Sequence, residues 1–167
     1  KKSHHCAVFH RIAKEFAALL NRGNLHGLWA NDLRDADEDA RHQKLRTAVE
    51  SYRDALAVAA SGLQGQRFAF VGYLPTEAAE RAVRVRALES LSQREQQTQV
   101  AIETPYRNAA LMAALLEALK PSTQLSVACG LTMPGGWCLT KTVTQWRAVP
   151  PRFESKHLPA VFCWLAG

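Results

Sequence analysis

A short polar segment after an apolar run holds the residues of this sequence best suited to chemistry. It places a carboxylate, a phenol and a guanidinium within five positions, as Glu103, Tyr106 and Arg107. Glu103 could orient or deprotonate a nucleophile, Arg107 could hold a phosphate, and Tyr106 could stack on a base. A structural interpretation stays open for each: an ion pair between Glu103 and Arg107, and core packing for Tyr106.

The elements around this segment explain why the apolar run stops there. Thr104 can cap a following helix, and Pro105 suits its first position because that position's N–H would be unpaired in any case. In an open α/β sheet, ligands bind at the carboxyl ends of strands, beneath helix N-termini. The segment is therefore either an ordinary strand-to-helix corner or the rim of a ligand cleft.

The alternation of short apolar runs and amphipathic stretches predicts an α/β domain. We expect a mixed, mostly parallel five-stranded sheet with an antiparallel edge, covered by helices. Helices are predicted over residues 76–93 and Tyr106–Leu119. The predicted strands are Arg67–Gly72, Thr98–Glu103, Gln124–Cys129, Cys138–Trp146 and Ala160–Leu165.

A change in residue composition and pattern divides the chain into a helical segment of unknown role, residues 1–55, and the α/β domain, residues 56–167. A net charge of +6 would suit an acidic partner such as RNA. With no membrane-length apolar run and no secretory signal, we expect a cytoplasmic protein with no membrane association. The four cysteines have no close-spaced pair, which favours free thiols, and we expect no metal site.

Three segments also carry a family resemblance, and they read ASGLQGQRFAFVGYLP, IETPYRN and GLTMPGGWCLTKTVTQW. In this order and spacing they resemble the C-terminal domain of the tetrapyrrole methylase superfamily, close to its ribosomal-RNA 2′-O-methyltransferase branch. The resemblance covers roughly Ala57 to Gly167. It departs from the family in Lys1–Arg53, where the N-terminal domain is not recognisable, and at Gly130, where an acidic residue is expected.

The resemblance implies a homodimeric methyltransferase that binds S-adenosylmethionine in a cleft between two domains. It implies that the β-strand end lies beside the cofactor, with Glu103 orienting the nucleophile or the cofactor. Tyr73 would border the substrate entrance, and Tyr106 and Arg107 would flank the cleft. The cofactor-side residues would be Ala101, Ile102, Thr104 and Pro105.

Two functions remain open from the sequence. One is an S-adenosylmethionine-dependent methyltransferase acting on RNA, with ribose 2′-O-methylation as the expected reaction. The other is a non-catalytic dimerisation or interaction module that keeps only this C-terminal domain.

Overall fold

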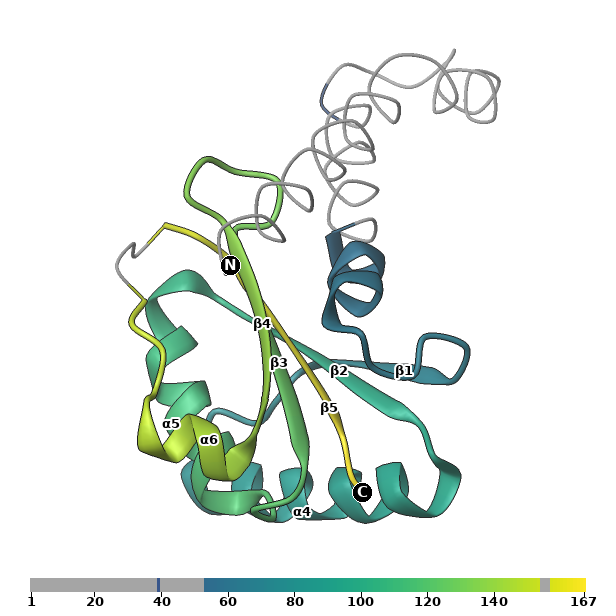
Figure 1. Cartoon of the computed structure of the whole chain (residues 1–167). Coiled ribbons are helices and arrows are strands. Elements are labelled where there is room, and N and C mark those ends of the chain that lie inside the picture. The colour runs from purple at the N-terminus through teal and green to yellow at the C-terminus, as the bar shows by residue number, and fades with distance from the viewer. Residues whose placement is uncertain (1–38, 40–52, 154–156) are drawn as a thin grey trace.

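The computed structural model describes Asp39, residues 53–153 and residues 157–167. Nearly all of the predicted N-terminal helical segment therefore lies outside the described residues. The described part is an α/β unit (Figure 1). Its elements are β1 (Phe68–Tyr73), α4 (Ala78–Glu95), β2 (Thr98–Glu103), η2 (Pro105–Arg107), α5 (Asn108–Ala118), β3 (Gln124–Cys129), β4 (Trp137–Thr142), α6 (Val143–Ala148) and β5 (Ala160–Leu165).

The five strands form one sheet in the order β1-β2-β5-β3-β4. The expected mixed five-stranded sheet is confirmed, but the expectation that it is mostly parallel, with antiparallel pairing only at an edge, is wrong, because three of its four strand pairings are antiparallel. β1 pairs with β2 in parallel, whereas β5 lies antiparallel between β2 and β3, and β4 pairs antiparallel with β3. The insertion of β5 follows from its composition, because its AVFCWL run is buried at five of six positions and belongs in the middle of a sheet.

One face of the sheet is covered by α4, α5 and α6 (Figure 1). Phe162 and Trp164 from β5 pack there with Leu111 and Leu115 from α5, all at most 2% exposed. Polar side chains then fix the connections between these helices. The buried carboxylate of Glu89 on α4 accepts hydrogen bonds from the Lys120 N–H and the Thr123 hydroxyl, which anchors the turn between α5 and β3.

The prediction of a strand over Cys138–Trp146 is wrong in its second half. β4 ends at Thr142, and residues Val143–Ala148 form the helix α6. Thr142 and Gln145 make a capping box, in which each side chain accepts from the other residue's backbone N–H. This cap satisfies helix N-terminal donors and outweighs the strand preference of Val143 and Trp146.

The opposite face of the sheet has a smaller cover. Residues 53–61 are helical and place Ala57 and Val58 against Val100, Val161 and Cys163. The helix ends before Gly62, whose positive φ of 68° suits a glycine. Among the described residues the two faces therefore differ in cover: three helices pack on one face, and helical residues 53–61 pack on the other.

Candidate functional site

A cavity of about 280 Å³ lies on the face of the sheet that carries helical residues 53–61. It opens at the carboxyl ends of β2 and β3, beside the start of the antiparallel β5. Its lining is mainly apolar, with a few polar and charged groups. The lining residues are Arg53, Asp54, Tyr73, Ile102, Glu103, Pro105, Ala128, Gly130, Leu131, Thr132, Met133, His157, Pro159, Ala160 and Val161.

Segments that are far apart in sequence converge on this cavity. Tyr73 comes from the end of β1, Glu103 from the end of β2, and Leu131 from the loop after β3. Each belongs to a different one of the three segments that carry the family resemblance. The expectation of a ligand cleft at the carboxyl end of the sheet thus coincides with a real cavity.

Glu103 is the buried acidic group of the cavity wall, with a side chain 1% exposed. Its Oε1 accepts from the Thr104 N–H at 2.8 Å and from the Thr104 hydroxyl at 3.1 Å. Its Oε2 lies 3.2 Å from Nη2 of Arg107, without hydrogen-bond geometry. The ion pair that the sequence left as an alternative therefore forms, and Oε2 is buried without a hydrogen-bond donor from the described residues.

The corner after Glu103 begins with a 3₁₀ turn rather than an α-helix. Pro105–Arg107 form η2, and α5 starts at Asn108, two residues later than predicted. Thr104 precedes this turn, but its side chain caps nothing, because its hydroxyl is bonded to Glu103 instead. Asn108 is buried and donates to the Leu158 carbonyl at 2.9 Å, which ties the corner to the segment before β5.

The residues predicted for the site divide into those that reach the cavity and those that do not. Tyr73, Ile102, Glu103 and Pro105 line it. Ala101 does not, since it is fully buried in the core on the α4 face.

Thr104 and Arg107 do not line the cavity, but both contact the carboxylate of Glu103, which does. Tyr106 is 74% exposed and lies outside the cavity lining, so the alternative of core packing is wrong for this residue.

The loop from Gly130 to Gly136 forms one wall of the cavity and depends on two glycines. Gly130 has a φ of +57°, and a Cβ on Gly136 would lie 1.8 Å from the Gly130 carbonyl oxygen. The loop closes through hydrogen bonds from Met133 N–H to Gly130 O and from Gly136 N–H to Met133 O. This turn presents Leu131, Thr132 and Met133 to the cavity.

Sequence reasoning missed the lining groups that come from outside the three segments. Arg53 donates from Nε to the Thr132 hydroxyl at 3.0 Å and so links the helix at 53–61 to the loop after β3. Asp54 and His157 also line the cavity. Nothing in the local sequence pattern of Arg53 or Asp54 signals a site.

The buried thiols near the sheet favour their neutral form. Burial raises the pKa of Cys129, and burial, followed by the nearby Cys138 and Asp54, raises the pKa of Cys163. These groups are poor nucleophiles in the folded chain, because the reactive form of cysteine is the thiolate.

The remaining observations concern metals and membranes. Within residues 53–153 and 157–167 and at Asp39, no three His, Cys, Asp or Glu side chains are grouped as metal ligands. None of the helices in this described part combines the length and apolar character needed to cross a bilayer.

Comparisons with known proteins find similar solved structures but no similar sequence. No protein-family model and no curated protein sequence matches the chain. Among solved structures, the chain is similar to the one titled "Crystal structure of the methyltransferase CobJ", with a TM-score of 0.44 and 16% sequence identity. The match covers 66% of this chain and 46% of that one, so this chain spans less than half the length of its structural neighbour.

Proposed function

We propose that this chain forms the C-terminal, cleft-forming part of an S-adenosylmethionine-dependent methyltransferase, and that its methyl acceptor is RNA. The observation that carries the proposal is the convergence of the three family-like segments on one cavity. The carboxyl ends of β1, β2 and β3 lie at one edge of the sheet, and the segments that carry the family resemblance are the ones that meet there. The RNA acceptor rests on the resemblance to the ribosomal-RNA branch and on the net charge of +6.

The cavity fits part of such a cofactor. At about 280 Å³ it is close to the lower end of small-molecule pockets, which suits one domain's share of a ligand held between two domains. Its apolar lining, with Ile102, Leu131 and Met133, suits a flat ring system. The Oε2 atom of Glu103 has no hydrogen-bond donor among the described residues, and because it is buried, an N–H or O–H group of a ligand would reach it only after the Glu103 side chain turns.

When bound, S-adenosylmethionine supplies an electrophilic methyl group. The protein then has to hold the nucleophile in line and exclude water. In our proposal the glycine-dependent loop and the end of β2 form the walls that do this. Glu103 acts as a positioning residue, because Thr104 and Arg107 hold its carboxylate in place.

Cofactor binding can be tested by calorimetric titration of the full chain with S-adenosylhomocysteine. We expect a micromolar dissociation constant. Met133→Trp should fill the cavity and weaken binding at least tenfold. Leu139→Trp is the matched control, because Leu139 is 49% exposed on β4 and does not line the cavity. An absence of heat for the parent chain at millimolar ligand would refute the proposal.

The acceptor can be tested separately by transfer of a radiolabelled methyl group. An RNA oligonucleotide should accept the label, and the same sequence with 2′-deoxyribose should not if the ribose hydroxyl is the nucleophile. Label on both would move the reaction to the bases, and label on neither, with cofactor bound, would remove RNA from the proposal.

One observation favours a non-catalytic module as the second candidate. The Glu103 carboxylate is already held by Thr104 and Arg107, an arrangement that a purely structural corner would also have. Under this alternative the chain would bind neither S-adenosylmethionine nor its product, and the same titration separates the two functions.

A further inference from the structure

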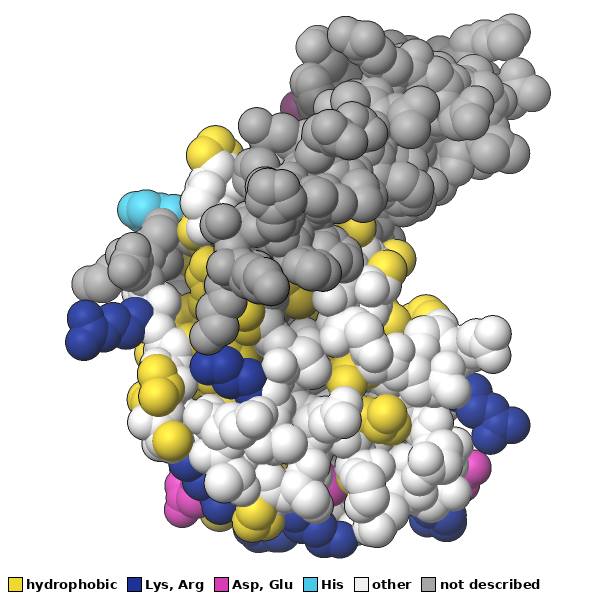
Figure 2. All heavy atoms as spheres, viewed as in Figure 1, with side chains coloured by type: hydrophobic (Ala, Val, Ile, Leu, Met, Phe, Trp, Pro, Cys, Tyr) yellow, Lys and Arg dark blue, Asp and Glu magenta, His cyan; other side chains and the backbone are white. Residues whose placement is uncertain are grey.

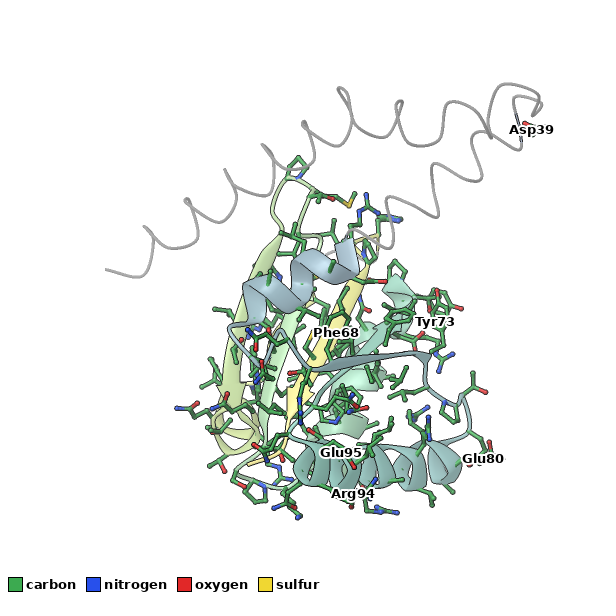
Figure 3. The ribbon with its side chains drawn as sticks, turned by 90° about the vertical axis from the view of Figure 1, so that its right-hand side faces the viewer. Asp39, Phe68, Tyr73, Glu80, Arg94 and Glu95 are labelled. Atoms are coloured by element: carbon green, nitrogen blue, oxygen red, sulfur yellow. The ribbon has the colours of Figure 1, made fainter. Side chains whose placement is uncertain are left out.

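Three exposed aromatic side chains follow one another along β1 at the edge of the sheet. Phe68 is 48% exposed, Phe70 52% and Tyr73 62%. Figure 3 shows Phe68 and Tyr73 on β1, above α4 with its labelled charged residues Glu80, Arg94 and Glu95. In the view of Figure 2, described charged side chains lie mostly around the rim near α4.

A bulge places all three aromatic side chains on the same face. Phe68, Phe70 and Tyr73 pair with Thr98, Val100 and Ile102 of the parallel strand β2, and the register shifts between Phe70 and Gly72. Without this shift, Tyr73 would point to the α4 face, because neighbouring residues alternate along a strand. Gly72 supports the bulge with a φ of +69°.

This face is the one on which the cavity lies. Val100 and Ile102 belong to the cluster under helical residues 53–61, and Tyr73 and Ile102 also line the cavity. The strip of Phe68, Phe70 and Tyr73, here called the aromatic strip, therefore starts at the sheet edge and ends at the cavity.

We infer that the aromatic strip stacks the bases of a single-stranded RNA and leads that strand to the cavity. The inference rests on the proposed function for its link to methyl transfer, and it adds the surface by which the RNA substrate would be held. Base–aromatic stacking tolerates any sequence, because every base has a π-face.

The residue pattern of β1 supports an RNA occupant. The RNA-binding strand motif of RNA-recognition modules reads Lys/Arg-Gly-Phe/Tyr-Gly/Ala-Phe-Val-x-Phe/Tyr, and its aromatic residues stack on bases. The segment FAFVGY, Phe68–Tyr73, matches the last six positions of that motif. The sheet here is not the four-stranded sheet of those modules, so the likeness concerns how side chains are presented and not common descent.

The charges along β1 do not oppose a polyanion on this strip. Arg67 directly precedes Phe68 and is exposed, but its Nη1 donates to the Glu95 carbonyl at the end of α4, so it lies on the α4 side of the strand and not beside the rings. No carboxylate side chain stands between Ser61 and Thr76 in the sequence, so the strip presents aromatic rings with no negative charge on its own strand.

The area of the strip is too small for a stable protein partner. A buried aromatic side chain covers about 150–250 Å². Three that are about half exposed offer on the order of 300 Å², whereas a stable interface needs about 800 Å² per partner. A second copy of the chain is therefore the less suitable occupant.

The test uses fluorescence anisotropy of a labelled 12-nucleotide single-stranded RNA with the full chain at low salt. We expect saturable binding, weakened about fivefold or more by each of Phe68→Ala and Phe70→Ala. Val83→Ala on α4 is the matched control, since Val83 is equally apolar and 63% exposed, and it should bind as the parent does. Circular dichroism and thermal unfolding check that each variant is folded.

Two further variants separate base stacking from plain apolar contact. Phe68→Leu and Phe70→Leu keep an apolar side chain but lose the ring, so they should weaken RNA binding almost as much as alanine does. If they bind RNA normally, or if the alanine variants match Val83→Ala, the inference is wrong. If sedimentation instead shows a dimer that the alanine variants dissociate, the strip is a self-association surface and the inference is also wrong.

Failure here is distinguishable from failure of the proposed function. The anisotropy measurement needs no cofactor, and the S-adenosylhomocysteine titration needs no RNA. A chain that binds the cofactor analogue but loses no RNA affinity in the Phe68 and Phe70 variants would refute the strip alone.

Discussion

The two faces of the sheet differ in how completely the described residues bury them. The face under α4, α5 and α6 encloses the larger core cluster, with Trp146, Phe162 and Trp164 almost completely buried. The face under helical residues 53–61 has a smaller cluster, an open cavity and an aromatic strip. Most of the stability should therefore come from the first face, and the chemistry should take place on the second.

The largest effect should come from truncating the packed face at Trp146. Its ring is 1% exposed, its Nε1 donates to the Leu125 carbonyl at 2.8 Å, and Lys141 Nζ lies 4.6 Å from the ring centroid. Trp146→Ala should lower the free energy of unfolding by about 3–5 kcal/mol, measured by urea denaturation. Val149→Ala, at a 65% exposed position nearby, should change it by less than about 0.5 kcal/mol. A loss below about 1 kcal/mol for Trp146→Ala would contradict the comparison.

Gly136→Ala should lower both the stability and the ligand affinity of the face that holds the cavity. The new Cβ would meet backbone atoms of Gly130, its oxygen at 1.8 Å and its carbonyl carbon at 2.5 Å, so the loop must move. We expect a loss of about 1–3 kcal/mol in stability and at least tenfold weaker binding of S-adenosylhomocysteine. Gly65→Ala is the control, because nothing lies within 4 Å of its Cβ. Unchanged ligand affinity in Gly136→Ala would separate this loop from the site.

A smaller effect is expected at the ion pair in the cavity wall. Glu103→Gln keeps an oxygen for Thr104 but removes the charge that faces Arg107. Because the Arg107 side chain is 26% exposed, water screens part of the loss, and we expect about 1–2 kcal/mol from urea denaturation. Glu95→Gln removes the exposed pair with Arg94 and should have almost no effect. Equal effects for the two variants would mean that burial of Glu103 adds nothing.

Strand positions could be predicted where the chain is buried on both sides. The ranges Thr98–Glu103, Gln124–Cys129 and Ala160–Leu165 match the structure, because each contains a short apolar stretch of strand length bounded by polar or turn-forming residues. The helix at Val143 was missed although its signal was present. Thr142 and Gln145 have the spacing of a capping box, and this cap favours a helix more strongly than the residues between them favour a strand.

The candidate site could be predicted only in part. Ile102, Glu103 and Pro105 could be predicted because they lie at or just after the end of β2, where α/β sheets bind ligands, and because the family resemblance implies that this strand end lies beside a cofactor. Arg53 and His157 could not be found, because they reach the cavity from segments more than 100 residues apart and only tertiary packing brings them together. The antiparallel placement of β5 was missed for the same reason, since strand order is not a local property.

The smallest expected effect is a difference in reactivity between two buried thiols, one on each face of the sheet. Cys129 packs in the cluster under the three helices, and Cys163 lies under helical residues 53–61. Burial raises the pKa of both thiols, so at pH 8 iodoacetamide should modify neither in the native chain, as mass spectrometry of the peptides would record. In urea below the global transition, Cys163 should react first, because its smaller cover opens more easily.

The raised thiol pKa values also set the sign of a pH dependence. The unfolded chain deprotonates its cysteines above about pH 8.5, whereas the buried thiols stay neutral. The free energy of unfolding should therefore fall as the pH rises above that value, and below it these two groups should contribute no slope. Cys163→Ala should remove the part of this slope that Cys163 contributes.

The order in which the two thiols react tests the comparison of the two faces. If Cys129 reacts before Cys163 at intermediate urea, the face under α4, α5 and α6 is not the more stable one, and the assignment of most of the stability to that face is wrong.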